Sequence, residues 1–316
     1  MAGQALGFHQ LHRGAKNSWW RSLLGVVLLL LIGLVILPLF LEVAILVGIL
    51  ASGTDDVLAD YQRLLDLTNP TPLGLAHLNL VLAGLIPTVF FISWALHGLK
   101  PGWRTSIMPR MRWSFFAVCL GLSFIALFAT LLVSALVPAA SQGDGAGEIS
   151  TQVNDFTATT MQFALVVLFL TPLQAAGEEY AFRGYLTQVF GGHFPTVVAI
   201  LVPAVLFALA HGAQDPPIFV DRLAFGIVSG VLVVMTGGLE AGIAMHVLNN
   251  WLAFGLALAF GDLGEALTPT GGTWWSLPVT LTQSLVYLGL VLFCAKHLGV
   301  KRTVDRAVLA GPRGAV

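Results

Sequence analysis

The sequence predicts an all-α protein that crosses a lipid bilayer with about eight helices. Hydrophobic residues make up 57% of the 316 positions and charged residues only 10%, and a water-soluble fold could not bury so much apolar surface. Apolar runs close to the roughly 20 residues needed to span a bilayer recur from Leu23 to Ala295. Cys119 and Cys294 both lie within such runs, where we expect small buried thiols and no disulfide.

Polar or Gly/Pro-rich segments separate these runs and define the expected spans. The spans lie near residues 23–50, 73–96, 113–139, 157–177, 196–211, 223–236, 239–260 and 277–295. The fourth run continues with helical spacing through residues 178–190 until Gly191, Gly192 and Pro195 interrupt it. We therefore expect one long, bent helix there. The first run is longer than a signal-peptide core, which predicts a retained first span.

The basic residues predict the orientation, because cytoplasmic loops of membrane proteins carry the excess of Lys and Arg. With the N-terminus inside, 13 of the 15 basic residues fall in segments 1–22, 97–112, 178–195 and 296–316. We therefore expect both termini to be cytoplasmic and the number of spans to be even. The net charge of −1 gives no reason to expect a nucleic-acid partner.

Ionisable side chains at membrane depth are costly and are therefore candidate functional groups. The first group, Glu178, Glu179 and Arg183, lies at the end of the fourth run. Glu179 and Arg183 are four residues apart with the acid first, the favourable order for an ion pair on one helix face. Glu178 points about 100° away on the helix and has no evident local partner. A structural ion-pair network at a helix end is the alternative explanation of this group.

Two further motifs place histidines in apolar runs. His211 follows Phe207 by four residues at the end of the fifth run, and His246 and Asn250 share one helix face in the seventh. Counted along their helices, Glu178 and the two histidines reach similar depths. They could meet, with Asn250, in one cavity open toward the cytoplasm. The alternatives are a structural histidine at a helix end and a His–Asn hydrogen-bonded pair between helices.

Three other features have structural explanations in the sequence. Glu42 is expected near the outer end of the first span as an interfacial acid, although it could also support the site. Glu240 stands at the start of the seventh helix, where a carboxylate suits the helix dipole. Gly226 and Gly230 form a GxxxG pattern that favours close helix packing.

This set of side chains suits the hydrolysis of a carbonyl compound. A buried carboxylate beside an imidazole can hold and polarise water, as Glu178 and His211 would do. A second imidazole and an amide N–H can donate to an oxygen that becomes negative, as His246 and Asn250 would do. Alternatively, Glu178, His211 and His246 are a sufficient ligand set for zinc with an open position for water. The residues alone support both interpretations.

The three motifs together resemble those of the CPBP intramembrane endopeptidases, also called the Abi or CAAX amino-terminal protease family, which includes the Ras-converting CAAX endopeptidases. The family pattern is EExxxR, FxxxH and HxxxN on separate membrane helices. This chain has these motifs in the same order at residues 178–183, 207–211 and 246–250. The resemblance covers roughly residues 157–260 and implies an eight-helix membrane core that hydrolyses a peptide bond.

The resemblance also implies roles for individual residues. The catalytic ones would be Glu178 with His211 on the water and His246 with Asn250 on the oxyanion. The structural ones would be Glu179, Arg183 and Phe207. The family has been described both as metalloproteases and as metal-independent glutamate proteases. We expect the metal-free form without a cofactor, with zinc on Glu178, His211 and His246 as the alternative.

These expectations divide the chain into four segments and predict the class of its substrate. Residues 1–22 would be a cytoplasmic segment, 23–156 the first three spans, 157–260 the catalytic membrane core, and 261–316 the last span and a basic cytoplasmic tail. The resemblance implies a bacterial cytoplasmic membrane and a substrate that is a peptide or membrane protein in contact with lipid. A non-proteolytic scaffold or immunity protein, or a transporter using the same polar cluster, is the alternative. Transporters often show two related halves, and we find no such symmetry in the sequence.

Overall fold

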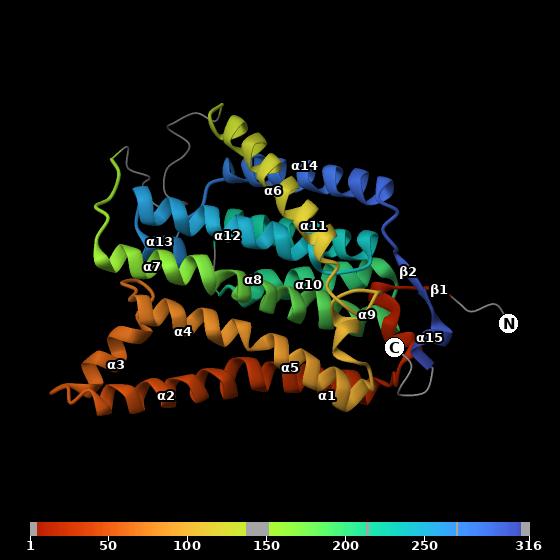
Figure 1. Ribbon diagram of the computed structural model, residues 1–316, viewed down its shortest axis with the longest axis horizontal. Coiled ribbons are helices and arrows are strands. Elements are labelled where there is room, and N and C mark those ends of the chain that lie inside the picture. Colours follow the sequence, from red (N-terminus) through yellow and green to blue (C-terminus); the bar gives the residue numbers. More distant parts are fainter. Residues whose placement is uncertain (1–4, 137–151, 213–214, 270, 311–316) are drawn as a thin grey trace.

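The computed structural model describes residues 5–136, 152–212, 215–269 and 271–310, and these are almost entirely helical. A short antiparallel pair of strands, β1 (Ala5–Gly7) and β2 (Thr303–Asp305), joins the two terminal segments. Both segments therefore lie at the same end of the molecule, at the right of Figure 1. This arrangement agrees with an even number of crossings; the side of the membrane on which they lie stays a prediction.

The first half of the chain forms three helical crossings. The elements are a 3₁₀ segment (Phe8–Gly14), α1 (Trp19–Leu31), a π-helical turn (Ile32–Ile36), α2 (Leu37–Ala51), α3 (Val57–Leu65), α4 (Pro72–Ala83), α5 (Leu85–Ile92), a second π-helical turn (Ser93–His97), a 3₁₀ turn (Pro101–Arg104) and α6 (Trp113–Ser134). Thr71 begins α4 by accepting a hydrogen bond from the Gly74 amide on its side chain, which satisfies one of the free N–H groups at a helix start.

The second half contains the motif-bearing helices. The elements are α7 (Ala158–Phe169), α8 (Thr171–Glu179), a π-helical segment (Tyr180–Leu186), α9 (Thr187–His193), α10 (Thr196–Ala210), α11 (Pro216–Thr236), α12 (Glu240–Phe260), α13 (Leu263–Leu267), α14 (Ser276–His297) and α15 (Arg306–Ala310). The expected long helix is confirmed, because α7, α8, the π-helical segment and α9 run on continuously as one apolar helix from Ala158 to His193. Pro172 in the first turn of α8 follows the interruption at Leu170 between α7 and α8, since proline lacks a backbone donor; a bend in this helix stays a prediction.

Seven helices of the described chain are long and apolar enough to cross a membrane. The remaining expected span, near residues 196–211, corresponds to α10, which is apolar but has only 15 residues. At 1.5 Å per residue it measures roughly 22 Å, less than the roughly 30 Å of a hydrocarbon core. The expected topology places Thr196 near the membrane surface, and His211 at the other end of α10 is then expected within the hydrocarbon layer.

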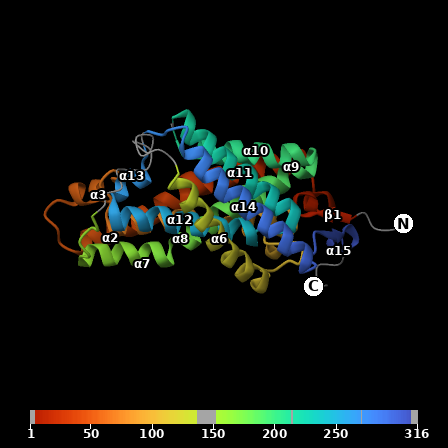
Figure 2. The ribbon, with the colours of Figure 1, turned by 90° about the horizontal axis from the view of Figure 1, so that it is seen from above.

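The helix that carries Glu178 and Glu179 lies inside the bundle. α8 packs between α4 and α12, as Figure 1 shows, whereas α10 packs on α11 and α6 on α14. Figure 2 shows α8 beside α12 from above. A Cβ at Gly177 would lie 2.0 Å from the carbonyl oxygen of Leu82. Only glycine therefore permits this approach of α8 to the α4–α5 crossing, which places the adjacent Glu178 in the interior.

Aromatic side chains indicate the two membrane surfaces. Trp19, Trp20, Trp94 and Trp113 are exposed near the end that carries β1 and β2, and Trp274 and Trp275 are exposed at the opposite end of α14. Exposed tryptophans gather at headgroup level in membrane proteins. The helices between these two levels carry exposed Leu, Val, Ile and Phe side chains, which form the lipid-facing surface.

Candidate active site

Glu179 connects three parts of the bundle and is fully buried. Its Oε1 accepts a hydrogen bond from Arg183 Nη1 at 2.9 Å, so the expected ion pair is confirmed. The same oxygen lies 3.1 Å from His246 Nδ1 on α12, and Oε2 accepts from Ser229 Oγ on α11 at 2.7 Å. The sequence did not indicate the last two contacts. Glu179 therefore fixes α8 against both α11 and α12.

A glycine provides the space that this carboxylate occupies. A Cβ at Gly242 on α12 would lie 2.7 Å from Ser229 Oγ and 2.8 Å from Glu179 Oε2. The close packing expected from Gly226 and Gly230 is also present, since Cβ atoms there would lie 3.0 Å from Ala204 and from Ile200 of α10. Gly242 thus leaves room for the buried acid, while Gly226 and Gly230 allow α11 to pack closely on α10.

Glu178 does have a local partner, contrary to the sequence expectation. Gln174, one helical turn earlier on α8, donates from Nε2 to Glu178 Oε1 at 2.9 Å. Glu178 Oε2 is buried and has no hydrogen-bond donor within the described residues, although His246 Nε2 lies 3.5 Å away. The carboxylate is therefore held at one oxygen, while the other faces an imidazole.

Gln174 was missed by the sequence analysis, although its spacing of four from Glu178 in an apolar run is a signal that could have identified it. Its Oε1 accepts a hydrogen bond from Asn250 Nδ2 at 2.9 Å. The side chain therefore connects Glu178 on α8 with Asn250 on α12. One of the two N–H bonds of the Asn250 amide is used in this contact, and the other is available to a ligand.

His246 presents its two ring nitrogens to two consecutive glutamates, Nδ1 to Glu179 and Nε2 to Glu178. Because an ionised carboxylate only accepts hydrogen bonds, Nδ1 carries the proton in the contact with Glu179. Nε2 and Glu178 Oε2 then face each other, and a proton on either atom makes the contact favourable. The sequence prediction that His246 and Asn250 point into the same space agrees with this geometry; their role in binding an oxyanion stays a prediction.

His211 lies beside this group without touching Glu178. Its Nδ1 donates to the Phe207 carbonyl oxygen at 2.7 Å, since a carbonyl only accepts, and this leaves Nε2 available. The Phe207 ring lies edge-on to the His211 ring, with 4.6 Å between centroids, and 5.9 Å from that of His246. Within the described chain, His211 and Glu178 form neither a hydrogen bond nor an ion pair.

Phe207 contacts several residues of the candidate site and does more than occupy the last turn of α10. The guanidinium carbon of Arg183 lies 4.2 Å from the centroid of its ring, a favourable cation–π distance. The same ring contacts both histidines. Phe207 therefore packs against the buried Arg183 charge and against both imidazoles.

Zinc on Glu178, His211 and His246 is the alternative to the metal-free prediction. Among the described residues, no three His, Cys, Asp or Glu side chains are gathered closely enough to hold a metal ion. Both the metal-free and the zinc-dependent catalytic type stay predictions.

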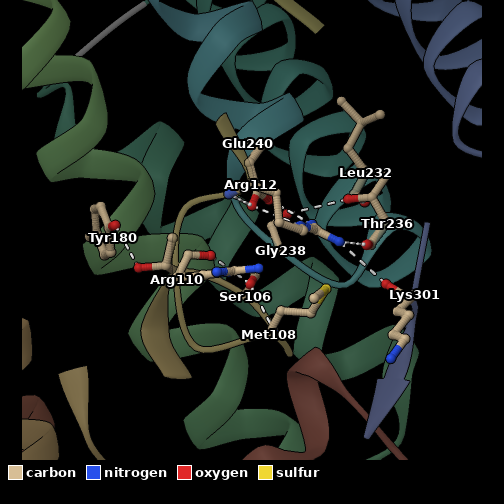
Figure 3. A network of polar contacts seen from close by, with 11 residues as sticks. Ser106, Met108, Arg110, Arg112, Tyr180, Leu232, Thr236, Gly238, Glu240 and Lys301 are labelled. Carbon is tan, nitrogen blue, oxygen red and sulfur yellow. Dashed lines mark hydrogen bonds and ion pairs between the residues drawn. The ribbon is translucent and has the colours of Figure 1, made fainter. Parts of the chain in front are cut away.

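Glu42 and Glu240, which the sequence analysis assigned structural roles, lie in different surroundings. Glu42 on α2 accepts a hydrogen bond from Tyr61 at 3.0 Å and belongs to the α2–α3 corner, away from the site. Glu240 is fully buried, so its position at the start of α12 explains only part of its role. It forms an ion pair with Arg112 at 2.6 Å and also accepts from the Arg112 backbone N–H. Figure 3 shows this pair fixing the start of α12, the helix that carries His246 and Asn250.

Comparisons with known proteins cover this same part of the chain. Residues 160–252 match the family described as Type II CAAX prenyl endopeptidase Rce1-like. The chain is also 27% identical over 212 residues to the uncharacterized protein YyaK of Bacillus subtilis (strain 168), an alignment that covers 63% of this chain and 68% of that protein. No solved structure matches the chain.

The family match contains all three motifs. It begins in α7 and ends in α12, so it includes Gln174, Glu178, His211, His246 and Asn250. A membrane protease of the CAAX type is the general activity that this family supports. The resemblance read from the motifs is therefore confirmed: the membrane core of this chain is similar to the Rce1-like type II CAAX prenyl endopeptidases.

Proposed function

We propose that this chain is an intramembrane endopeptidase that hydrolyses a peptide bond of a membrane-associated substrate. The observation that best supports this function is the environment of Glu178. One carboxylate oxygen is held by Gln174, while the other is buried with no hydrogen-bond donor among the described residues and faces His246. A carboxylate held in this way is prepared to take a proton from a water molecule.

In the proposed first step, Glu178 Oε2 removes a proton from water as the water oxygen bonds to the substrate carbonyl carbon. The electron pair of the C=O π bond moves onto the carbonyl oxygen. His211 orients the water through Nε2, because its Nδ1 proton is committed to Phe207. These proposed roles require the water molecule to lie between Glu178 and His211. The absence of a direct contact between the two side chains agrees with this.

In the second step, the negative oxygen accepts hydrogen bonds from His246 Nε2–H and from the available N–H of Asn250. Donors positioned in advance stabilise such an oxygen more than the ground-state carbonyl. The C=O bond then re-forms, the C–N bond breaks, and the leaving nitrogen takes the proton held by Glu178. The products are a carboxylic acid and an amine, and Glu178 is restored as a carboxylate.

A comparison of membrane peptides from cells with wild-type protein and with Glu178→Gln tests the proposal. The substitution keeps the shape of the side chain and removes the base, so we expect the wild-type cleavage products to disappear. His211→Ala should have the same effect, and Glu42→Gln, which changes an acid outside the site, should retain the products. Turnover by Glu178→Gln at normal protein levels would refute the assignment.

The same experiment addresses the non-proteolytic alternative. A scaffold, an immunity protein or a transporter would yield no peptide difference between wild type and Glu178→Gln, while any cellular effect of the protein would persist in the variant. The bacterial relative supports a location in a bacterial cytoplasmic membrane, which fractionation of the source cells would establish.

A further inference from the structure

The connection between the second and third crossings forms a pocket that is separate from the candidate active site. The pocket has a volume of about 540 Å3. Its lining residues are Lys100, Gly102, Trp103, Met108, Pro109 and Arg110. Two of these residues are cations and none is an acid, so the pocket is complementary to an anion.

The loop that forms this pocket is held in place by contacts to the turn between α11 and α12. The Ile107 N–H donates to the Gly237 carbonyl at 2.9 Å, and the Leu239 N–H donates to the Thr105 carbonyl at 2.8 Å. Within the loop, Ser106 Oγ donates to the Arg110 carbonyl at 2.8 Å, as Figure 3 shows. The pocket is therefore preformed and requires little ordering to bind a ligand.

The two limbs of the loop also touch each other. A Cβ at Gly102 would lie 1.8 Å from the carbonyl oxygen of Pro109. This contact brings Lys100 and Arg110, ten positions apart in the sequence, to one pocket. The geometry that places the two cations together thus depends on glycine at position 102.

The four cations of this loop fall into two classes. Arg104 is fully buried and donates to Ser93 and Gln188, and Arg112 is committed to Glu240. Lys100 and Arg110 are exposed and line the pocket. Arg104 and Arg112 therefore serve the fold, and the side chains of Lys100 and Arg110 lie at the surface beside the pocket.

The depth of the pocket follows from the tryptophans on either side of it. Trp94 precedes the loop and is 65% exposed, and Trp113 follows it and is 70% exposed. Tryptophans in such positions lie at the level of lipid headgroups. Lys100 and Arg110 are therefore placed at the depth of lipid phosphate groups, with Trp103 and Met108 beside them as apolar contacts.

We propose that this pocket binds the phosphate headgroup of an anionic phospholipid. Lys100 and Arg110 contact the phosphate, Arg110 through a planar fork suited to two phosphate oxygens, while Trp103 and Met108 pack against the glycerol and the first acyl carbons. A bound lipid would fix the loop and, through Gly237 and Leu239, the start of α12. The proposal does not depend on catalysis, because its ligand and residues differ from those of the candidate active site.

Native mass spectrometry of the detergent-purified full chain tests this proposal with two lipids that share the same acyl chains. Dioleoyl phosphatidylglycerol should bind more tightly than dioleoyl phosphatidylcholine. Lys100→Gln combined with Arg110→Gln should weaken phosphatidylglycerol binding roughly thirtyfold, since each basic residue near an anionic headgroup contributes roughly a fivefold factor. Binding of phosphatidylcholine should not change.

Matched variants make the test specific. Lys296→Gln with Arg306→Gln removes the same charge from exposed positions at the same end of the molecule and should leave the binding intact. Lys100→Arg with Arg110→Lys keeps the charge and should retain most of the binding. Equal losses in the pocket variant and the Lys296/Arg306 variant, or equal affinity of the wild type for both lipids, would overturn the proposal. If low millimolar inorganic phosphate displaces phosphatidylglycerol, the pocket binds free phosphate and the proposal of a lipid ligand is wrong.

Discussion

Nδ1 of His246 lies 3.1 Å from Oε1 of Glu179, although 67 positions separate the two residues. The same oxygen accepts a hydrogen bond from Arg183. One buried acid therefore neutralises a buried guanidinium and orients an imidazole whose other nitrogen faces Glu178. This shared oxygen connects the stability of the bundle to the geometry of the site.

Glu179→Gln should destabilise the protein much more than Glu178→Gln. The first substitution leaves the fully buried Arg183 without its counter-charge, a change that costs about 3 kcal/mol or more for a buried pair. Thermal unfolding of both variants in the same detergent measures the difference. A melting temperature of Glu179→Gln equal to that of wild type would contradict this role.

Gln174→Leu should lower kcat by about tenfold or more, because the side chain holds both Glu178 and Asn250 and no group of the leucine can replace it. KM should change little, since no substrate contact is assigned to Gln174. Gln162→Leu, an exposed position on α7, makes the same chemical change outside the site. We expect this control to keep wild-type turnover, and a similar loss in both variants would point to a general effect on folding.

Gly242→Ala should reduce both stability and activity, because the added methyl group would meet Ser229 and Glu179 at less than 3 Å. Gly255→Ala on the same helix is the control, since nothing lies within 4 Å of a Cβ there. Alanine favours a helix over glycine by about 1 kcal/mol. Gly255→Ala should therefore melt at or above the wild-type temperature, and equal melting temperatures for the two variants would contradict the packing argument.

The terminal segment should loosen as the pH falls. Burial, and then the neighbouring Arg13 charge, lowers the pKa of His9 from 6.5 to about 4. Its ring lies 3.0 Å from Thr196 at the start of α10. Between about pH 6.5 and 4 the unfolded segment binds the proton more readily than the folded one, so stability decreases as the pH falls through this range.

Hydrogen exchange of residues 5–14 at pH 7.5 and at about pH 5 measures this effect. The protection factor, which compares the measured exchange rate with the intrinsic rate at the same pH, should fall at the lower pH in the wild type. His9→Asn removes the titrating group, so its protection factor should depend less on pH. An unchanged pH dependence in the variant would show that another group is responsible, and His12 is the first alternative because burial also lowers its pKa.

Cleavage should survive removal of divalent metals, because the described His, Cys, Asp and Glu side chains form no cluster that would hold an ion. Prolonged dialysis against a zinc chelator, followed by an activity assay and metal analysis, measures this. Loss of turnover that is restored by added zinc would show that the site rearranges into a metal centre when substrate is present.

Much of the local structure could be predicted from the sequence. The spans appear as apolar runs, and Glu179 and Arg183 share a helix face because 3.6 residues complete a turn. The same rule would have identified Gln174 beside Glu178. The contacts of Glu179 with Ser229 and of Glu240 with Arg112 had no such signal, since their partners are 50 and 128 positions away.

By itself, the sequence determined that this is a helical membrane protein and that three polar motifs lie on three of its helices. It did so because apolar length and helical periodicity are local properties. Only the tertiary structure decided that His246 lies between two glutamates, that Asn250 meets Gln174, and that His211 stays out of contact with Glu178. Those relationships depend on how far each helix is rotated and shifted against its neighbours. That placement is set by close packing at Gly177 and Gly242.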